Sequence, residues 1–128
     1  MRRLLILVPL VLALALAACG GQSASSGGAG DVAAGAQVFA NETAPACGSC
    51  HSLEAGVTLV GPSLAGIGTQ AGSMEAGKSA ELYLRESITD PNAFVVEGFL
   101  ANIMPTVYGG QLTSKQIDDL VAYLLSLK

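Results

Sequence analysis

Two cysteines and a histidine lie within five consecutive positions of this chain, in Cys47-Gly-Ser-Cys50-His51. The chain has three cysteines and one histidine in total, so this short motif contains all of them except one cysteine. A motif with this spacing is a redox dithiol, part of a zinc site, or the attachment point of a haem. Each of these requires a different fold around it, so this motif limits the fold more than any other feature.

Two of these interpretations fit the rest of the chain poorly. A closed zinc site needs four ligands, usually cysteine or histidine, and the sequence has no residue of either type after His51. A redox dithiol has the right spacing, but such motifs open a helix after a strand. No alternating pattern near Cys47 indicates a strand, and a dithiol would leave His51 without a fixed role.

Haem attachment accounts for all three residues of the motif. The thiols of Cys47 and Cys50 can add across the two vinyl groups on one edge of the macrocycle. His51 then lies below the iron, where its neutral imidazole binds the metal. The sequence therefore predicts one covalently bound haem c.

A sixth iron ligand should come from a different segment, so that it faces the opposite side of the porphyrin. Met74 and Met104 are the candidates after the N-terminal segment. Met74 lies in a run rich in glycine and serine, with little to hold a sulfur in place. Pro105 restricts the backbone of Met104, so we expect Met104 to be the ligand. The alternative role for Met104 is to fill a gap in the core.

The first eighteen residues have the pattern of an export signal. Two arginines precede an apolar run of 15 residues, Leu4 to Ala18, which is shorter than the roughly 20 that a membrane span needs. The run ends in Leu16-Ala17-Ala18-Cys19, which resembles the lipobox of bacterial lipoproteins. We expect cleavage before Cys19 and acylation of its thiol. An ordinary signal peptide with a cysteine near the cut is the alternative.

The rest of the chain divides into a linker and one domain. Residues 19–30 are the lipidated cysteine and a stretch of glycine, serine and alanine that reads as a flexible tether. Residues 31–128 then form a small domain, which we expect to be exported and held at a bacterial membrane, facing the periplasm or the outside of the cytoplasmic membrane. The domain has ten acidic and four basic side chains, a net charge of −6. This charge argues against nucleic acid and favours partners with a basic docking patch.

Hydrophobic periodicity and capping residues predict an all-α domain. Asp31 can cap a helix over Val32 to Ala40, and Ser79 can cap another over Ala80 to Ile88. Thr113-Ser-Lys-Gln116 is a capping box that opens the last helix. Gly56 to Gly77 reads as loops with short turns. We expect about four helices with long connections between them.

On these residues, Asp31 to Lys128 resembles a class I c-type cytochrome. Gly35 and Phe39 match the glycine and the aromatic residue that meet the terminal helix in that family, where Tyr123 is the matching residue. Gly61-Pro62-Ser-Leu64 fits the family's loop in which a proline carbonyl accepts the second ring N–H of the haem histidine. The resemblance therefore implies that Pro62 orients His51.

The resemblance implies a monomeric electron carrier with one haem and no enzymatic activity. The segments Ile88-Thr-Asp-Pro-Asn-Ala-Phe94 and Val96-Glu-Gly-Phe99 are similar to haem domains attached to subunit II of some bacterial cytochrome c oxidases. The expected partners are membrane complexes of a respiratory or photosynthetic chain: a quinol-oxidising donor and an oxidase or reaction centre as acceptor. The alternative function is a haem enzyme, or a gas-reactive or sensor domain, with a labile sixth ligand.

Overall fold

The computed structural model describes residues 30–128, and these residues contain helices and no strand. The signal peptide expected at 1–18, Cys19 and most of the linker lie outside the described residues. The all-α prediction is confirmed, although five α-helices and one short 3₁₀-helix are found in place of about four helices. In chain order these elements are α1 (Val32–Asn41), η1 (Cys47–Ser49), α2 (Ile67–Met74), α3 (Ala80–Thr89), α4 (Tyr108–Gln111) and α5 (Ser114–Ser126).

The helix starts follow the capping residues in the sequence. The Asp31 side chain accepts a hydrogen bond from the amide of Ala34 at 2.9 Å, and the Ser79 hydroxyl accepts one from Leu82. Thr113 and Gln116 form both bonds of the capping box, which satisfies two amide groups that an open helix end would leave without partners. The predicted starts of α1, α3 and α5 are therefore confirmed, and α1 and α3 each run one residue past their predicted ends.

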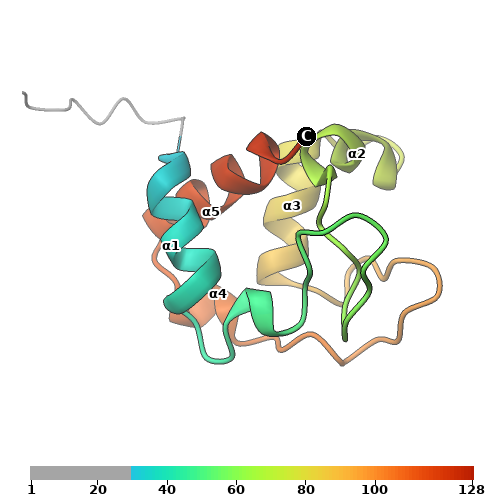
Figure 1. The fold of residues 1–128 in the computed structure, drawn as a ribbon, viewed down its shortest axis with the longest axis horizontal. Coiled ribbons are helices and arrows are strands. Elements are labelled where there is room, and N and C mark those ends of the chain that lie inside the picture. Colours follow the sequence, from blue (N-terminus) through green and yellow to red (C-terminus); the bar gives the residue numbers. More distant parts are fainter. Residues whose placement is uncertain (1–29) are drawn as a thin grey trace, which may run out of the picture.

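Helices α1 and α5 lie against each other (Figure 1), and a glycine sets how closely they approach. A Cβ atom at Gly35 would lie 1.9 Å from the carbonyl oxygen of Asp119 on α5. Phe39 is one turn further along α1, and its ring centroid is 5.7 Å from that of Tyr123. These three residues meet as the resemblance implies.

The segment expected to be only loops contains a helix, so that part of the prediction is wrong. Helix α2 includes two glycines, which are poor helix formers, but its contacts with the C-terminal end of the chain compensate. The Gly68 amide donates to the Leu127 carbonyl at 2.8 Å, and a Cβ atom at Gly68 would lie 2.2 Å from the Leu125 carbonyl oxygen. Ala71 is completely buried. Tertiary packing therefore stabilises a helix that local propensity does not favour.

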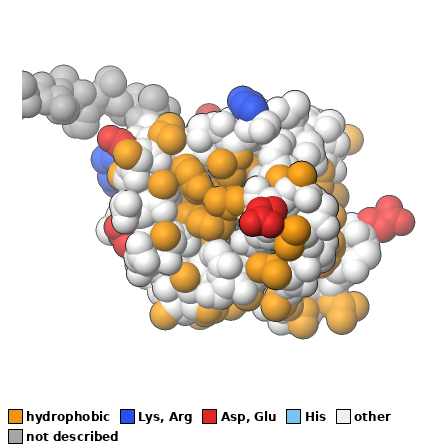
Figure 2. All heavy atoms as spheres, in the orientation of Figure 1, with side chains coloured by type: hydrophobic (Ala, Val, Ile, Leu, Met, Phe, Trp, Pro, Cys, Tyr) orange, Lys and Arg blue, Asp and Glu red, His pale blue; other side chains and the backbone are white. Residues whose placement is uncertain are grey.

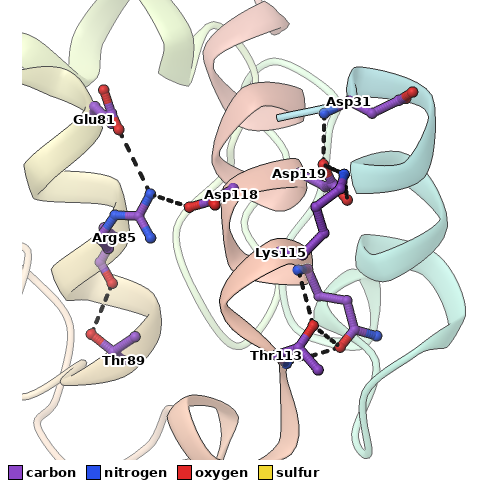
Figure 3. Close-up of polar contacts among 9 residues, drawn as sticks. Asp31, Glu81, Arg85, Thr89, Thr113, Lys115, Asp118 and Asp119 are labelled. Atoms are coloured by element: carbon purple, nitrogen blue, oxygen red, sulfur yellow. Dashed lines mark hydrogen bonds and ion pairs between the residues drawn. The ribbon is translucent and has the colours of Figure 1, made fainter. Parts of the chain in front are cut away.

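A backbone hydrogen bond and an ion pair fix α5 to its neighbours (Figure 3). Asp119 is buried, and its Oδ1 accepts hydrogen bonds from the Asp31 backbone amide at 2.6 Å and from Lys115 Nζ at 2.7 Å. On the other side of α5, Arg85 of α3 donates to Asp118 at 2.6 Å. Lys115, followed by the Asp31 amide, holds the pKa of Asp119 below its ordinary value. A single helix turn of α5 is thus bonded both to the start of α1 and to α3.

Within residues 30–128, no helix is both long and apolar enough to cross a bilayer.

Candidate functional site

A cavity of about 630 Å³ is enclosed by the helices and by the loops that follow η1 and α3. This volume lies within the range of small-molecule and cofactor sites. The predicted residues Cys47, Cys50, His51 and Met104 all line it, and so does Met74. The lining residues include no aspartate, glutamate, lysine or arginine. Figure 2 shows hydrophobic side chains gathered around a hollow in the middle of the face that it draws. The cavity is therefore apolar and has four sulfur atoms and one imidazole in its wall.

The turn at η1 brings the motif residues together. The amides of Cys50 and His51 both donate to the Cys47 carbonyl, at 3.1 Å and 3.0 Å, so the two cysteines and the histidine follow one tight turn. Two further backbone bonds tie this turn to the next loop, from the Gly61 amide to the Cys50 carbonyl at 2.9 Å and from Leu64 to Ser52 at 2.8 Å. The motif is thus bonded on one side to the loop that contains Pro62.

The His51 ring is fixed by that loop. Its Nδ1 atom lies 2.9 Å from the carbonyl oxygen of Pro62, the contact that the resemblance implies. A carbonyl oxygen can only accept, so Nδ1 carries the hydrogen and Nε2 keeps its lone pair free for a metal. A Cβ atom at Gly61 would lie 2.6 Å from His51 Cε1, so a glycine at this position leaves room for the imidazole.

Two hydroxyl groups fix the chain just before the motif, and sequence reasoning did not identify them. Tyr108 donates to the Pro45 carbonyl at 3.1 Å, and the buried Thr43 donates to the same oxygen at 2.9 Å. Tyr108 is buried as well, and burial raises the pKa of its phenol, which stays a donor at neutral pH. Tyr108 lies in α4, so this contact spans 63 residues, and no local sequence pattern predicts it.

The surroundings of the Cys47 thiol do not favour a redox dithiol. Cys47 and Cys50 are not joined in a disulfide. Burial raises the pKa of the Cys47 thiol, and the Thr43 hydroxyl, 3.7 Å away, opposes this effect only in part. Redox-active dithiols instead have a lowered pKa on the attacking thiol. In the described part of the chain, no three histidine, cysteine or acidic side chains are grouped so as to hold a metal ion.

Both candidate methionines reach the cavity, each from a different kind of segment. Met104 lies in a loop that is held at Asn102, whose amide donates to the Asn92 side chain at 2.7 Å. Asn102 has a φ of 62°, a left-handed backbone conformation that asparagine tolerates better than most residues. Met74 is the last residue of α2 and packs against the core. The expectation that little holds Met74 in place is therefore wrong, because it rested on the missed helix.

These residues fit a haem. The cavity walls are apolar and include Tyr83 and Phe94, whose rings meet edge to face at a centroid distance of 5.8 Å. The imidazole nitrogen and the thioether sulfur are iron ligands used in c-type cytochromes, and two free thiols lie beside the imidazole. The contact between the two rings was not predicted, although Phe94 ends one of the segments that carry the resemblance.

Comparison with known proteins gives one family. A family model described as Cytochrome c matches residues 32–128. Cytochrome c2 iso-2 of Magnetospirillum molischianum is 32% identical over 89 residues, which cover 64% of this chain and 91% of that protein. Cytochrome c2 iso-2 of Magnetospirillum fulvum is 33% identical over 88 residues, or 63% and 91% of the two chains. Cytochrome c2 iso-1 of Magnetospirillum molischianum is 31% identical over 91 residues, or 64% and 90%.

Proposed function

Because this chain belongs to the cytochrome c family, we propose that it carries single electrons between membrane complexes on a haem held by His51 and Met104. Family membership itself makes it an electron-transfer protein with covalently bound haem c, and its one attachment motif limits it to one haem. The proposal adds the residues that hold the haem, the location of the protein and its partners.

In this proposal each predicted residue has a distinct task. Cys47 and Cys50 bind the haem covalently, which keeps it in an exported protein. His51 and Met104 would each supply one ligand to the iron, and the Pro62 carbonyl fixes the orientation and tautomer of the imidazole. The bound haem supplies an iron that alternates between the ferrous and ferric states, and a thioether ligand favours the ferrous one.

The observation that carries the proposal is the shared cavity. A histidine with its Nε2 free lines the same apolar space as Met74 and Met104. We choose Met104 because Pro105 restricts its backbone and the Asn102 bond to Asn92 holds its loop. With both ligands supplied by the protein, the iron would have no open position for a substrate, and this would favour an electron carrier over an enzyme or a gas sensor. The uncharged wall keeps the local dielectric low, which disfavours the more highly charged ferric state.

The proposed location follows from the sequence before residue 31. We place an 18-residue signal peptide at the start, lipid on Cys19 and a flexible linker up to residue 30. As a coil, the 11 residues of the linker from Gly20 to Gly30 span roughly 18 Å, so the domain could turn toward large partners at the membrane surface. A quinol-oxidising complex as donor and a terminal oxidase or reaction centre as acceptor suit such a protein.

The function is tested on the full chain produced in cells that mature c-type cytochromes. We expect a pyridine haemochrome spectrum of one covalent haem per chain and a reversible one-electron titration. Carbon monoxide should leave the spectrum of the native reduced protein unchanged over minutes. A colourless protein would contradict the proposal, and rapid carbon monoxide binding would favour the enzyme or sensor alternative.

The anchor is tested separately with Cys19→Ser. This variant should move from the membrane fraction to the soluble exported fraction, and the mass of its N-terminus should lack acyl chains. Its haem content should equal that of the wild type. Membrane retention of an unacylated Cys19→Ser variant would contradict lipid anchoring.

A further inference from the structure

Helix α4 follows Met104 in the chain, and its own sequence does not account for it. It has only four residues, Tyr108–Gln111, and two of them are glycines, which are poor helix formers. Its N-cap residue, Val107, makes no side-chain capping bond. A single helical turn is marginal in water because nucleation is unfavourable. Helix α4 is therefore stabilised by contacts with other segments.

Two side chains of α4 bind the segment just before the attachment motif, and Figure 1 shows α4 beside this loop at the end of α1. The Tyr108 hydroxyl donates to the Pro45 carbonyl at 3.1 Å. Gln111 bonds to Ala44 twice: its Oε1 accepts from the Ala44 amide and its Nε2 donates to the Ala44 carbonyl, each at 3.3 Å. Positions three apart share one face of a helix, so one face of α4 holds the backbone of two consecutive residues.

The Pro45 carbonyl also accepts a local hydrogen bond. The Thr43 hydroxyl donates to the same oxygen at 2.9 Å from two positions away, whereas Tyr108 is 63 positions away. A carbonyl oxygen has two lone pairs, so both donors can bond at once, and loss of one hydroxyl does not leave the acceptor without a partner. The two bonds differ in what they connect: that of Thr43 shapes one turn, and that of Tyr108 joins two distant segments.

The bond between Tyr108 and Pro45 lies close in the chain to both halves of the proposed haem site. Pro45 is two residues before Cys47, and Tyr108 is four residues after Met104. Four residues extend to at most about 14 Å, so the position of Tyr108 limits how far Met104 can move from the attachment motif. The 53 positions that separate His51 from Met104 along the chain impose no such limit.

The loop that carries Met104 is held less firmly at its other points. Residues 90–107 contain no helix, and the bond from the Asn102 amide to Asn92 lies within this loop, so it shapes the loop without attaching it to the motif. The residues on either side of Met104 and Pro105, 101–103 and 106–107, are exposed. Irregular exposed segments open at a low cost in free energy, so attachment at α4 matters for keeping the loop closed.

We propose that α4 is a clamp that holds the Met104 loop to the haem-attachment motif, with Tyr108 and Gln111 as its positioning residues. The proposal rests on the proposed function, in which His51 and Met104 bind the same iron. Ligands from two segments stay bound together only while the segments stay together, so opening of the clamp lets Met104 leave and a foreign ligand enter. Tyr108 is buried, and its bond is therefore stronger than the longer, exposed bonds of Gln111.

The test follows the replacement of Met104 by imidazole in the purified ferric holoprotein. Stopped-flow loss of the sulfur-to-iron charge-transfer band gives a rate that levels off at high imidazole, where it equals the rate at which Met104 leaves. Tyr108→Phe removes only the hydroxyl and should raise this limiting rate about fivefold, the effect of one ordinary hydrogen bond. Gln111→Leu should raise it only about twofold. Amide hydrogen exchange at 100–107 should also be faster in Tyr108→Phe than in the wild type.

Two variants separate the clamp from other effects of a lost hydroxyl. Thr43→Val removes the local donor from the same Pro45 oxygen and keeps the link to α4, so it should raise the limiting rate less than Tyr108→Phe does. Tyr123→Phe makes the same substitution on α5, where the ring contacts Phe39, and it should leave the limiting rate unchanged.

Three results would overturn the proposal. They are a limiting rate in Tyr108→Phe equal to that of the wild type, an increase at least as large in Thr43→Val, and an equal increase in Tyr123→Phe. The second would show that the shape of the turn controls Met104, and the third that any loss of packing does. Failure of the proposed function is recognised separately, because the wild-type ferric protein would then lack the charge-transfer band. Hydrogen exchange at 100–107 would still decide the proposal in that case, since unchanged exchange in Tyr108→Phe would overturn it.

Discussion

The helical frame and the cavity wall of this domain are held together in different ways. The frame consists of α1, α3 and α5, each of which begins at a side-chain cap, and α5 is bonded to both of the others. The cavity wall consists largely of segments 44–66 and 90–107, in which the only helix is the three-residue η1. Many of its side chains line a space of about 630 Å³.

This difference indicates which part of the domain depends on its cofactor. Ordering a residue of irregular chain costs about 1–2 kcal/mol of backbone entropy, and that cost must be offset by contacts. In the frame, packed side chains and capped helices provide them. In the wall, most of the apolar surface can be buried only by a group inside the cavity. We therefore expect the frame to persist more readily than the wall when haem is absent.

The largest effect should come from the double variant Cys47→Ala/Cys50→Ala. Without either thiol, no covalent haem forms, so the haemochrome signal should disappear completely. Far-UV circular dichroism should show reduced helicity, and hydrogen exchange should show loss of protection first in 44–66 and 90–107. Cys19→Ser is the matched control, because it removes the third cysteine and should leave haem content unchanged. A haem-free variant with full native helicity and protection would refute the contrast between frame and wall.

A substitution in the frame should act on folding and leave the haem site unaffected. Gly35→Ala puts a methyl group where the α5 backbone lies, 1.9 Å from the Asp119 carbonyl oxygen, so the two helices must move apart. We expect a loss of about 3 kcal/mol in the free energy of unfolding, measured by denaturant titration of the holoprotein, with little change in the reduction potential.

Gly110→Ala is the control for this change. It makes the same substitution in α4, where a Cβ atom would meet nothing within 4 Å, and it should not destabilise the domain. Equal destabilisation by both variants would show that the close contact between α1 and α5 is not the cause.

A substitution in the cavity wall should instead change the haem site and have little effect on folding. Met104→Ala removes the proposed sulfur ligand, so the sulfur-to-iron charge-transfer band should vanish. The potential should fall, within the ~0.8 V range over which axial ligands act. Met74→Ala changes the other methionine in the cavity wall and should leave band and potential nearly unchanged. If Met74→Ala abolishes the band and Met104→Ala does not, Met74 and not Met104 is the iron ligand.

The frame could be predicted from the sequence much better than the wall. Caps and apolar periodicity are local properties, so the starts of α1, α3 and α5 follow from residues such as Asp31 and Thr113. Helix α2 was missed because its stability comes from contacts of Gly68 with Leu125 and Leu127, about 60 positions away. Local pattern cannot show such contacts.

The candidate site also contains features that the sequence predicts and features that it does not. Cys47, Cys50 and His51 form a contiguous motif, so their closeness was evident from spacing alone. The hydroxyl of Tyr108 on the Pro45 carbonyl and the edge-to-face contact of Tyr83 with Phe94 depend on how distant segments meet. Burial of Asp119 was also missed, because its side chain is enclosed only once α1 is in place.

The smallest effect should come from Asp119→Asn, and it depends on pH. Lys115 and the Asp31 amide lower the pKa of Asp119 in the folded protein. The charged carboxylate therefore stabilises the fold above the unfolded pKa of about 3.9, and this contribution is lost as pH falls through the lower folded value. Because Lys115 is 66% exposed and screened by water, we expect a difference from wild type of only ~0.5–1 kcal/mol at pH 6.

Thermal unfolding at several pH values checks this expectation. The difference between wild type and Asp119→Asn should be constant from pH 6 to 5 and should shrink below about pH 4. Lys115→Met removes the main cause of the lowered pKa and should reproduce much of the effect. Asp119, Lys115 and the Asp31 amide all belong to the frame. If the frame persists in the haem-free double cysteine variant, the same difference should be found there. A difference that stays constant down to pH 3 would show that the contribution of Asp119 does not depend on its charge.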